Sequence, residues 1–294
     1  MKETHGYLLI VAASIIWGTM GIFGKLAFEY RISAVTLIAL RLLISSLTIL
    51  TPIALLKREL FKIQRRDLPK FLVLGIVATA LQRITYFYAI DLTTATIAAI
   101  LFYTYPIFVT IYASLFLKEK ATFLTAFAII LTFSGATFVV KAYEVAWLRA
   151  SFYGVIFGVL SSVFFALYFL ITKKLRRHYT AWTLILYDDV IGAMALTPII
   201  CFSFSEIVNY PQQLWFLIFA IAWFPSLTAY LLYSCALKHV KSAKGSILSV
   251  IEPISTAVFS ATILQENFEP LQVMGVTLAL IGVFLLFYKP KLKN

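Results

Sequence analysis

The stretch YTYPIFVTIYASLFLKE at residues 103–119 has a counterpart in VIEPISTAVFSATILQE at residues 250–266. A constant offset of 147 places Pro106 on Pro253, and the closing glutamate of the first stretch on that of the second. The match extends without a gap over fifty-five positions, and segments nearer the start of each copy align one residue out of step. We therefore interpret the chain as a duplicated unit.

The composition predicts that both copies lie in a membrane. Of 294 residues, 62% are hydrophobic and only 13% are charged, which is outside the soluble range. Ten apolar stretches of roughly 20 to 25 residues follow one another, each long enough to cross a hydrocarbon core about 30 Å thick as a helix. We expect an all-α integral membrane protein with ten transmembrane helices, five in residues 1–141 and five in residues 152–294. The stretches lie at approximately 6–28, 32–56, 70–90, 93–117, 121–140, 152–173, 181–204, 213–237, 243–264 and 270–288.

An odd number of crossings in each copy predicts an inverted repeat. Five crossings leave the chain on the opposite side of the bilayer, so the second unit must insert upside down, as in many secondary transporters. In this topology 19 Lys and Arg residues lie on one side, three on the other and three inside helices. The bias predicts two cytoplasmic termini and a multi-pass location in the cell membrane. The formal charge of +12 is thus a topology and lipid-headgroup signal and argues against nucleic-acid binding.

The duplicated motifs resemble those of a known family. The sequence YTYP at 103–106, followed by LKE at 117–119, is similar to the end of an EamA-type repeat of the drug/metabolite transporter superfamily. IEP at 251–253 with LQE at 264–266 is similar to the same element in a second repeat. A glycine is usual where LKE and LQE carry their middle residues, so the local turn departs from the family pattern. Further matches are Trp17-Gly18, Leu40-Arg41, Gly135 and Gly282.

This resemblance covers nearly the whole chain. It implies a ten-helix transporter of small metabolites, often an amino-acid exporter, with both termini in the cytoplasm. It does not name the solute, because one scaffold serves many ligands.

Ionisable side chains inside the predicted helices are the first candidates for a functional site. Each costs about 2.5 to 3.5 kcal/mol on insertion scales, so each should face a partner, a cavity or the bundle interior. Three are cationic and three are anionic, so complete internal pairing would balance them. They are Lys25, Arg41, Arg83, Asp188, Asp189 and Glu252.

Arg41 shares one face of its predicted helix with Ser45 and Thr48. Its planar guanidinium suits a clamp for a carboxylate or phosphate, and the alternative is a structural ion pair with Asp188 or Asp189. These neighbouring aspartates point about 100° apart around a helix, so at most one lies directly along a given face. Either could pair with an arginine, bind an ammonium group or take up a proton.

Arg83 lies nearer the predicted outer surface, where it could contact the solute or extend to water. Glu252 precedes Pro253, which removes a backbone donor and kinks a helix. A kinked helix with a carboxylate at mid-membrane depth suits a gate or a coupling site, and a hydrogen-bonded structural glutamate is the alternative. Tyr105 precedes Pro106 at the equivalent position, so the two halves would supply different groups to one central site.

Aromatic, polar and small residues complete the predicted site. Tyrosine and tryptophan rings can line a cavity while their polar tips orient a solute, although most aromatics in this chain must face lipid. Glycines at every third position let a neighbouring helix approach closely. The candidates are Trp17, Gln82, Tyr86, Tyr103, Tyr105, Tyr187, Tyr230 and Ser249 for binding, and Pro106, Pro253, Gly18, Gly21 and Gly24 for gating and packing.

Together these patterns predict a secondary transporter, with no cofactor or metal, whose halves rock about a central cavity. The expected substrate is a small metabolite such as an amino acid or another polar or amphipathic solute, and a proton is a candidate coupling ion. An uncoupled facilitator is the first alternative. An intramembrane lipid-modifying enzyme is a weaker one, because no clustered nucleophile, acid–base pair or metal motif is present.

Overall fold

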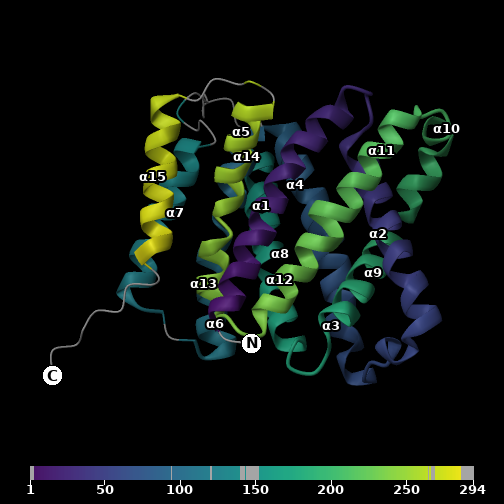
Figure 1. The fold of residues 1–294 in the computed structure, drawn as a ribbon, viewed down its shortest axis with the longest axis horizontal. Helices are drawn as coiled ribbons and strands as arrows, with labels where there is room; N and C mark the ends of the chain where they lie inside the picture. Colours follow the sequence, from purple (N-terminus) through teal and green to yellow (C-terminus); the bar gives the residue numbers. More distant parts are fainter. Residues whose placement is uncertain are drawn as a thin grey trace.

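The chain folds into a bundle of helices that run from one end of the molecule to the other (Figure 1). Every regular element in the described part of the chain is helical. Seven helical segments there are long and apolar enough to span a membrane, and three shorter apolar helices accompany them. The described helices thus make ten passes, as predicted. The computed structural model describes residues 3–93, 95–119, 121–139, 143, 152–263, 265 and 269–285.

Each half contributes five passes, joined by short connections. In the first half these are α1 (Glu3–Phe28), α2 (Ala34–Leu56), α3 (Leu68–Leu72) continuing through η3 (Val73–Leu81) into α4 (Gln82–Leu92), α5 (Ala95–Phe102) with α6 (Tyr105–Leu117), and α7 (Phe123–Val139). In the second half they are α8 (Phe152–Leu175), α9 (Ala181–Phe202), α11 (Gln212–Ile221) continuing through η6 (Ala222–Thr228) into α12 (Ala229–Leu237), α13 (Ser242–Leu248) with α14 (Ile251–Ile263), and α15 (Pro270–Leu285). The connections carry η1 (Arg58–Phe61), η2 (Arg65–Asp67) and α10 (Phe204–Ile207).

Two equivalent glycines show that the halves are inverted. Gly6 packs so closely on the connection after α12 that an added Cβ would lie 2.6 Å from Val240. Its counterpart Gly154 packs on the end of α4, where an added Cβ would lie 2.5 Å from Thr93. Since α4 ends where α1 ends, these glycines lie at opposite ends of the bundle. We call the end where α1 begins the basic end, after its excess of Lys and Arg, and the other the opposite end.

Irregular backbone occurs at matching places in the two halves. The third and eighth passes contain the π-helical segments η3 and η6, which overlap at the offset of 147. Lys118 and Gln265, also 147 apart, both adopt a positive φ, 56° and 54°. Glycine is favoured in this left-handed region, which explains why the family pattern has one there.

The fourth and ninth passes are each broken into two helices, whereas the sequence pattern predicted one helix for each, with a kink at Pro253 in the second. The breaks fall between α5 and α6 and between α13 and α14, immediately before the paired prolines Pro106 and Pro253. A proline lacks a backbone donor and clashes with the preceding turn, so helical bonding is interrupted there. Hydroxyl groups bond the carbonyls near each break, with Thr104 Oγ1 donating to Leu101 O at 2.6 Å and Ser249 Oγ to Gly245 O at 3.0 Å.

Glycines permit the closest helix contacts. An added Cβ at Gly18 of α1 would lie 2.6 Å from Ser255 Cβ of α14, and one at Gly21 would lie 3.0 Å from Thr256 Cγ2. At Gly24 no atom lies within 4 Å of that position. Helices α7 and α15 stand side by side at one edge of the bundle (Figure 1), where Gly135 leaves no room for a Cβ beside Ala279.

Candidate functional site

Four ionisable side chains gather in the interior, on α2, α4 and α9. Arg41, Arg83, Asp188 and Asp189 each expose at most 8% of their surface. Arg41 lies within Coulombic range of Arg83 and Asp189, and Asp188 lies within range of Arg83. We call these four residues the charged cluster. Its two positive and two negative charges balance.

The two aspartates bond hydroxyl groups of different elements. Asp188 accepts a hydrogen bond from Thr79 of η3, and Asp189 accepts one from Ser45 of α2. Neighbouring residues point about 100° apart around a helix, which accounts for the two directions. In the described ranges, neither carboxylate reaches an arginine at ion-pair distance.

Both arginines keep buried N–H groups that have no acceptor among the described residues. The free atoms are Nε of Arg41 and both Nε and Nη1 of Arg83. Nη1 of Arg41 donates only to the sulfur of Met20, at 3.3 Å, and the Arg83 guanidinium lies 5.5 Å from the centroid of the Tyr230 ring. A buried donor without an acceptor costs about 1 to 3 kcal/mol, and more when it is charged. The described chain therefore leaves part of the hydrogen-bonding capacity of both arginines unused.

The duplication explains why these residues meet. Arg41 corresponds to Asp189 at an offset of 148, and Arg83 corresponds to Tyr230 at an offset of 147. Both arginines therefore meet their own counterparts: Arg41 has a charge interaction with Asp189, and Arg83 has a cation–π contact with Tyr230. Residues that meet their counterparts lie beside the pseudo-twofold axis that relates inverted halves. The charged cluster is therefore central, with different chemistry at equivalent positions.

Aromatic rings continue the cluster from Tyr230. Its ring centroid lies 5.0 Å from that of Trp17 and 5.3 Å from that of Tyr168. Trp17 Nε1 and the Tyr168 hydroxyl are also buried without a hydrogen-bond partner in the described chain. Unsatisfied polar atoms thus extend beyond the arginines into the aromatic lining.

Glu252 occupies the first turn of α14, directly after the break that follows α13. Within the described chain, its carboxylate has no hydrogen bond and no ion pair. Three tyrosines, Tyr86, Tyr103 and Tyr105, lie within Coulombic range of it. All three contact the ring of Phe102, with centroid distances of 5.3, 5.7 and 5.4 Å. We call these three residues the tyrosine group.

Other predicted binding residues already have partners. Gln82 donates to Ser161 at 3.0 Å and so joins α4 to α8, and Ser249 bonds the carbonyl at the helix break described above. Tyr187 donates to the Phe61 carbonyl at 2.8 Å near the basic end, away from the charged cluster. Lys25 lies in the last turn of α1, towards the opposite end.

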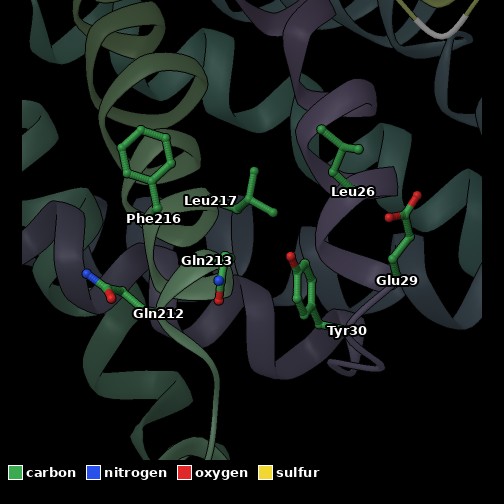
Figure 2. Close-up of a pocket in the computed structure, with 7 residues that line it drawn as sticks. All are labelled: Leu26, Glu29, Tyr30, Gln212, Gln213, Phe216 and Leu217. Carbon is green, nitrogen blue, oxygen red and sulfur yellow. The ribbon is translucent and has the colours of Figure 1, made fainter.

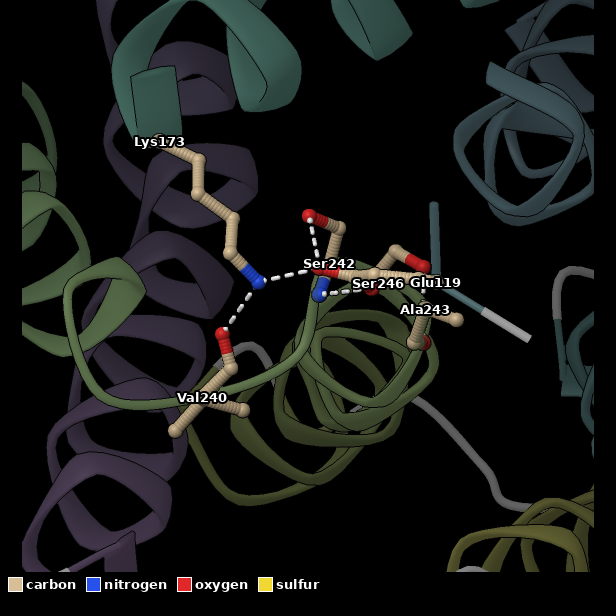
Figure 3. Close-up of polar contacts among 6 residues, drawn as sticks. All are labelled: Glu119, Lys173, Val240, Ser242, Ala243 and Ser246. Carbon is tan, nitrogen blue, oxygen red and sulfur yellow. Dashed lines mark hydrogen bonds and ion pairs between the residues drawn. The ribbon is translucent and has the colours of Figure 1, made fainter. Parts of the chain in front are cut away.

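At the basic end, polar contacts tie the two halves together (Figure 3). Lys173 of α8 donates to Glu119 Oε1 at 2.5 Å and to the Val240 carbonyl at 2.8 Å. Glu119 follows α6, and its Oε2 accepts from the backbone N–H of Ser242 at 2.9 Å, at the start of α13. We call Glu119, Lys173 and Ser242 the basic-end latch. Every charged group in it has a partner.

At the opposite end, a pocket of about 500 Å³ opens between the end of α1 and the start of α11 (Figure 2). Glu29 and the glutamines supply polar groups and Phe216 supplies a ring. Beneath it, Leu217 and Met20 pack in one apolar cluster, and Met20 in turn bonds Arg41. An apolar layer thus separates this pocket from the charged cluster. The pocket is lined by Leu26, Glu29, Tyr30, Gln212, Gln213, Phe216 and Leu217.

Sequence reasoning did not identify Tyr168, Met20 or Thr79 as neighbours of the charged cluster. The duplication carried a signal for two of them, since Met20 and Tyr168 are equivalent at the offset of 148. Met20 bonds Arg41, and Tyr168 lies within Coulombic range of Asp189, the counterpart of Arg41. No comparable signal marked Thr79.

Comparison with known proteins gives one family. The sequence model described as the EamA-like transporter family matches residues 4–141 and, separately, residues 152–288. Among solved structures, one crystal structure superposes with a TM-score of 0.78 over 97% of each chain, at 14% sequence identity. At that identity the likeness concerns the fold alone.

Curated relatives are named as transporters. An uncharacterized transporter of Bacillus subtilis, YetK, is 26% identical over 294 residues, covering 99% of this chain and 89% of that protein. An uncharacterized inner membrane transporter of Salmonella typhimurium, YicL, is 23% identical and covers 96% of this chain and 94% of the relative. The Pseudopaline exporter CntI of Pseudomonas aeruginosa is 27% identical over 216 residues, covering 74% of this chain and 72% of that protein.

Proposed function

Because the chain belongs to the EamA-like transporter family, we propose that it is a secondary transporter that binds the anionic group of a small solute at Arg41 and Arg83. Amino acids and related polar or amphipathic metabolites are the solute class that we propose. The family membership favours transport over the alternative of a lipid-modifying enzyme. The name of one relative, a Pseudopaline exporter, favours export as the direction.

The unsatisfied arginines carry this proposal. A cationic side chain in a membrane interior is costly, and a structural arginine would be expected to use its N–H groups on the protein. Here three N–H nitrogen atoms of Arg41 and Arg83 are buried without an acceptor in the described chain. A carboxylate presents two oxygens to such donors and forms charge-assisted hydrogen bonds that are stronger than neutral ones. An anionic solute would thus complete the site.

Alternating access is the mechanism that we propose. The broken passes α5–α6 and α13–α14 occupy equivalent places in the inverted halves, and such discontinuous helices typically form transporter binding sites. The basic-end latch holds α8 of one half against the chain after α6 of the other. Rocking of the halves would break this latch and open a path between the charged cluster and the basic end.

We propose that the basic end faces the cytoplasm. The described part of this end contains clusters of Lys and Arg in the connections after α2, α8 and α12, and cytoplasmic connections carry such an excess. Both termini would then lie in the cytoplasm, with the protein in the cell membrane. The pocket between α1 and α11 would face the outside.

Flux into proteoliposomes tests the function. We expect purified protein to carry at least one labelled amino acid, and Arg41→Gln and Arg83→Gln to lose that flux. Arg66→Gln, an exposed substitution at the basic end, serves as the matched control and should retain it. Normal flux in both interior variants would contradict the proposed binding site.

The same preparation tests coupling. We propose a proton as the coupling ion, so an imposed pH gradient should drive accumulation of the solute above its external concentration. A flux that only equilibrates the solute, whatever the gradient, would identify an uncoupled facilitator.

A further inference from the structure

Charge balance singles out Glu252. Arg41 and Arg83 face Asp188 and Asp189, so the charged cluster is neutral without Glu252. Within the described chain no cationic side chain pairs with Glu252, and Lys25 lies towards the opposite end in the last turn of α1. A carboxylate in the membrane interior is expected to have a compensating positive charge. The described chain does not provide it.

The surroundings of Glu252 favour an organic cation. Tyr86, Tyr103 and Tyr105 come from α4, the break after α5 and the start of α6, and they converge on one ring, that of Phe102. Tyr103 also packs against an apolar cluster that includes Val250 and Ile254, which lie on either side of Glu252 in the sequence. Aromatic rings with a carboxylate attract an ammonium group through cation–π and charge-assisted contacts.

Local structure stabilises the carboxylate only in part. Glu252 lies in the first turn of α14, where the helix dipole favours a negative charge by about 0.3 to 1 kcal/mol. The Tyr105 hydroxyl donates instead to the Ser246 carbonyl, at 3.2 Å. Glu252 is partly exposed, whereas the four residues of the charged cluster are buried.

We propose that Glu252 and the tyrosine group form a binding site for a protonated amine, so that the transported solute is dipolar. Its anionic group binds Arg41 and Arg83, and its ammonium group binds Glu252. This inference rests on the proposed function, because it adds a second pole to the same site. Tyr230 is close enough to both poles for charge interactions with Arg83, Arg41 and Glu252.

Matched ligand sets test the inference. Each set contains an amino acid, the acid that lacks its amine and the amine that lacks its carboxylate, for leucine, phenylalanine and methionine. Affinities are measured by isothermal titration of the purified protein. We expect at least one amino acid to bind about tenfold more tightly than either partial ligand, the effect of one charge-assisted contact.

Three variants identify the amine site. Glu252→Gln should lower the affinity for the amino acid and for the amine about tenfold and leave the affinity for the acid unchanged. Arg41→Gln should lower the affinity for the amino acid and for the acid and leave the affinity for the amine unchanged. The exposed control Glu59→Gln should change none of them. Size-exclusion chromatography checks that each variant is folded.

Substitutions at Tyr103 separate ring from hydroxyl. Tyr103→Phe keeps the ring and should retain amine affinity, whereas Tyr103→Leu should lose it. Equal affinity for amino acid and acid, both dependent on Arg41, would overturn the amine site and leave the proposed function standing. Unchanged amine affinity in Glu252→Gln would also overturn it. Failure of all nine ligands to bind would contradict both proposals.

Discussion

Arg176 and Arg83 show two different uses of the same side chain. At the basic end, Arg176 donates from Nε to the Ser234 carbonyl at 2.9 Å and from Nη1 to the Tyr179 carbonyl at 2.6 Å. In the interior, the same two atoms of Arg83 are buried without an acceptor in the described chain. Hydrogen bonds of Arg176 stabilise the structure, whereas we propose that the unsatisfied N–H groups of Arg83 are available to bind a ligand.

The same contrast separates the basic-end latch from the charged cluster. In the latch Lys173 and Glu119 share a short ion pair, and both have additional backbone partners. In the charged cluster, the arginines face aspartates that bond hydroxyls instead. We infer that the latch serves closure and stability and that the charged cluster serves binding, a division that makes separate predictions.

The largest effect is expected in transport. The double substitution Arg41→Gln and Arg83→Gln should reduce flux at least about a hundredfold, because it removes at least two charge-assisted contacts to the solute. The melting temperature should fall little, since the lost N–H groups bonded no oxygen of the described chain and both aspartates keep their hydroxyl partners, Thr79 and Ser45. Proteoliposome flux and thermal melting measure the two quantities. A large fall in melting temperature with retained flux would reverse the assignment.

The next effect is expected in stability. Lys173→Met should lower the free energy of unfolding by about 3 kcal/mol, because it leaves Glu119 largely buried without its cation. Adding Glu119→Leu should restore much of the loss, since the pair is then replaced by apolar contacts. Chemical denaturation measures both variants. Lys174→Met, exposed on the next residue of α8, is the control that should change little.

A smaller effect should separate two glycines of α1. Gly18→Ala should destabilise the protein by about 1 to 3 kcal/mol, because its Cβ would lie 2.6 Å from Ser255. Gly24→Ala has open space and should stabilise it by about 0.5 to 1 kcal/mol through helix propensity. Equal melting shifts would mean that the α1–α14 contact does not hold the site together.

The smallest effect concerns the turn beside the latch. Lys118→Gly should raise the free energy of unfolding by about 0.5 to 1 kcal/mol, because glycine adopts the positive φ without strain. Gln265→Gly should do the same in the other half. Both gains are read from denaturation midpoints, and a loss at either position would show that its side chain makes a stabilising contact.

The architecture could be predicted from the sequence, because the membrane thickness fixes the length of each helix and the duplication fixes the inverted repeat. The paired Pro106 and Pro253 located the irregular passes, and the 100° spacing of Asp188 and Asp189 predicted that they would point in different directions. Contacts between particular helices could not be predicted from the sequence. Gly18 and Gly24 have the same spacing pattern, yet only Gly18 meets a neighbour. Likewise, whether Arg41 pairs with an aspartate depends on side-chain positions that periodicity does not determine.

Thermal melting of Arg41→Gln and Lys173→Met, each with and without a saturating transported amino acid, tests the division between binding and closure most directly. We predict that Arg41→Gln melts near the wild-type temperature and shows a much smaller ligand-induced rise than the wild type. Lys173→Met should melt at a lower temperature and keep its rise. The reverse pattern, with Arg41→Gln unstable but still stabilised by ligand, would contradict the account.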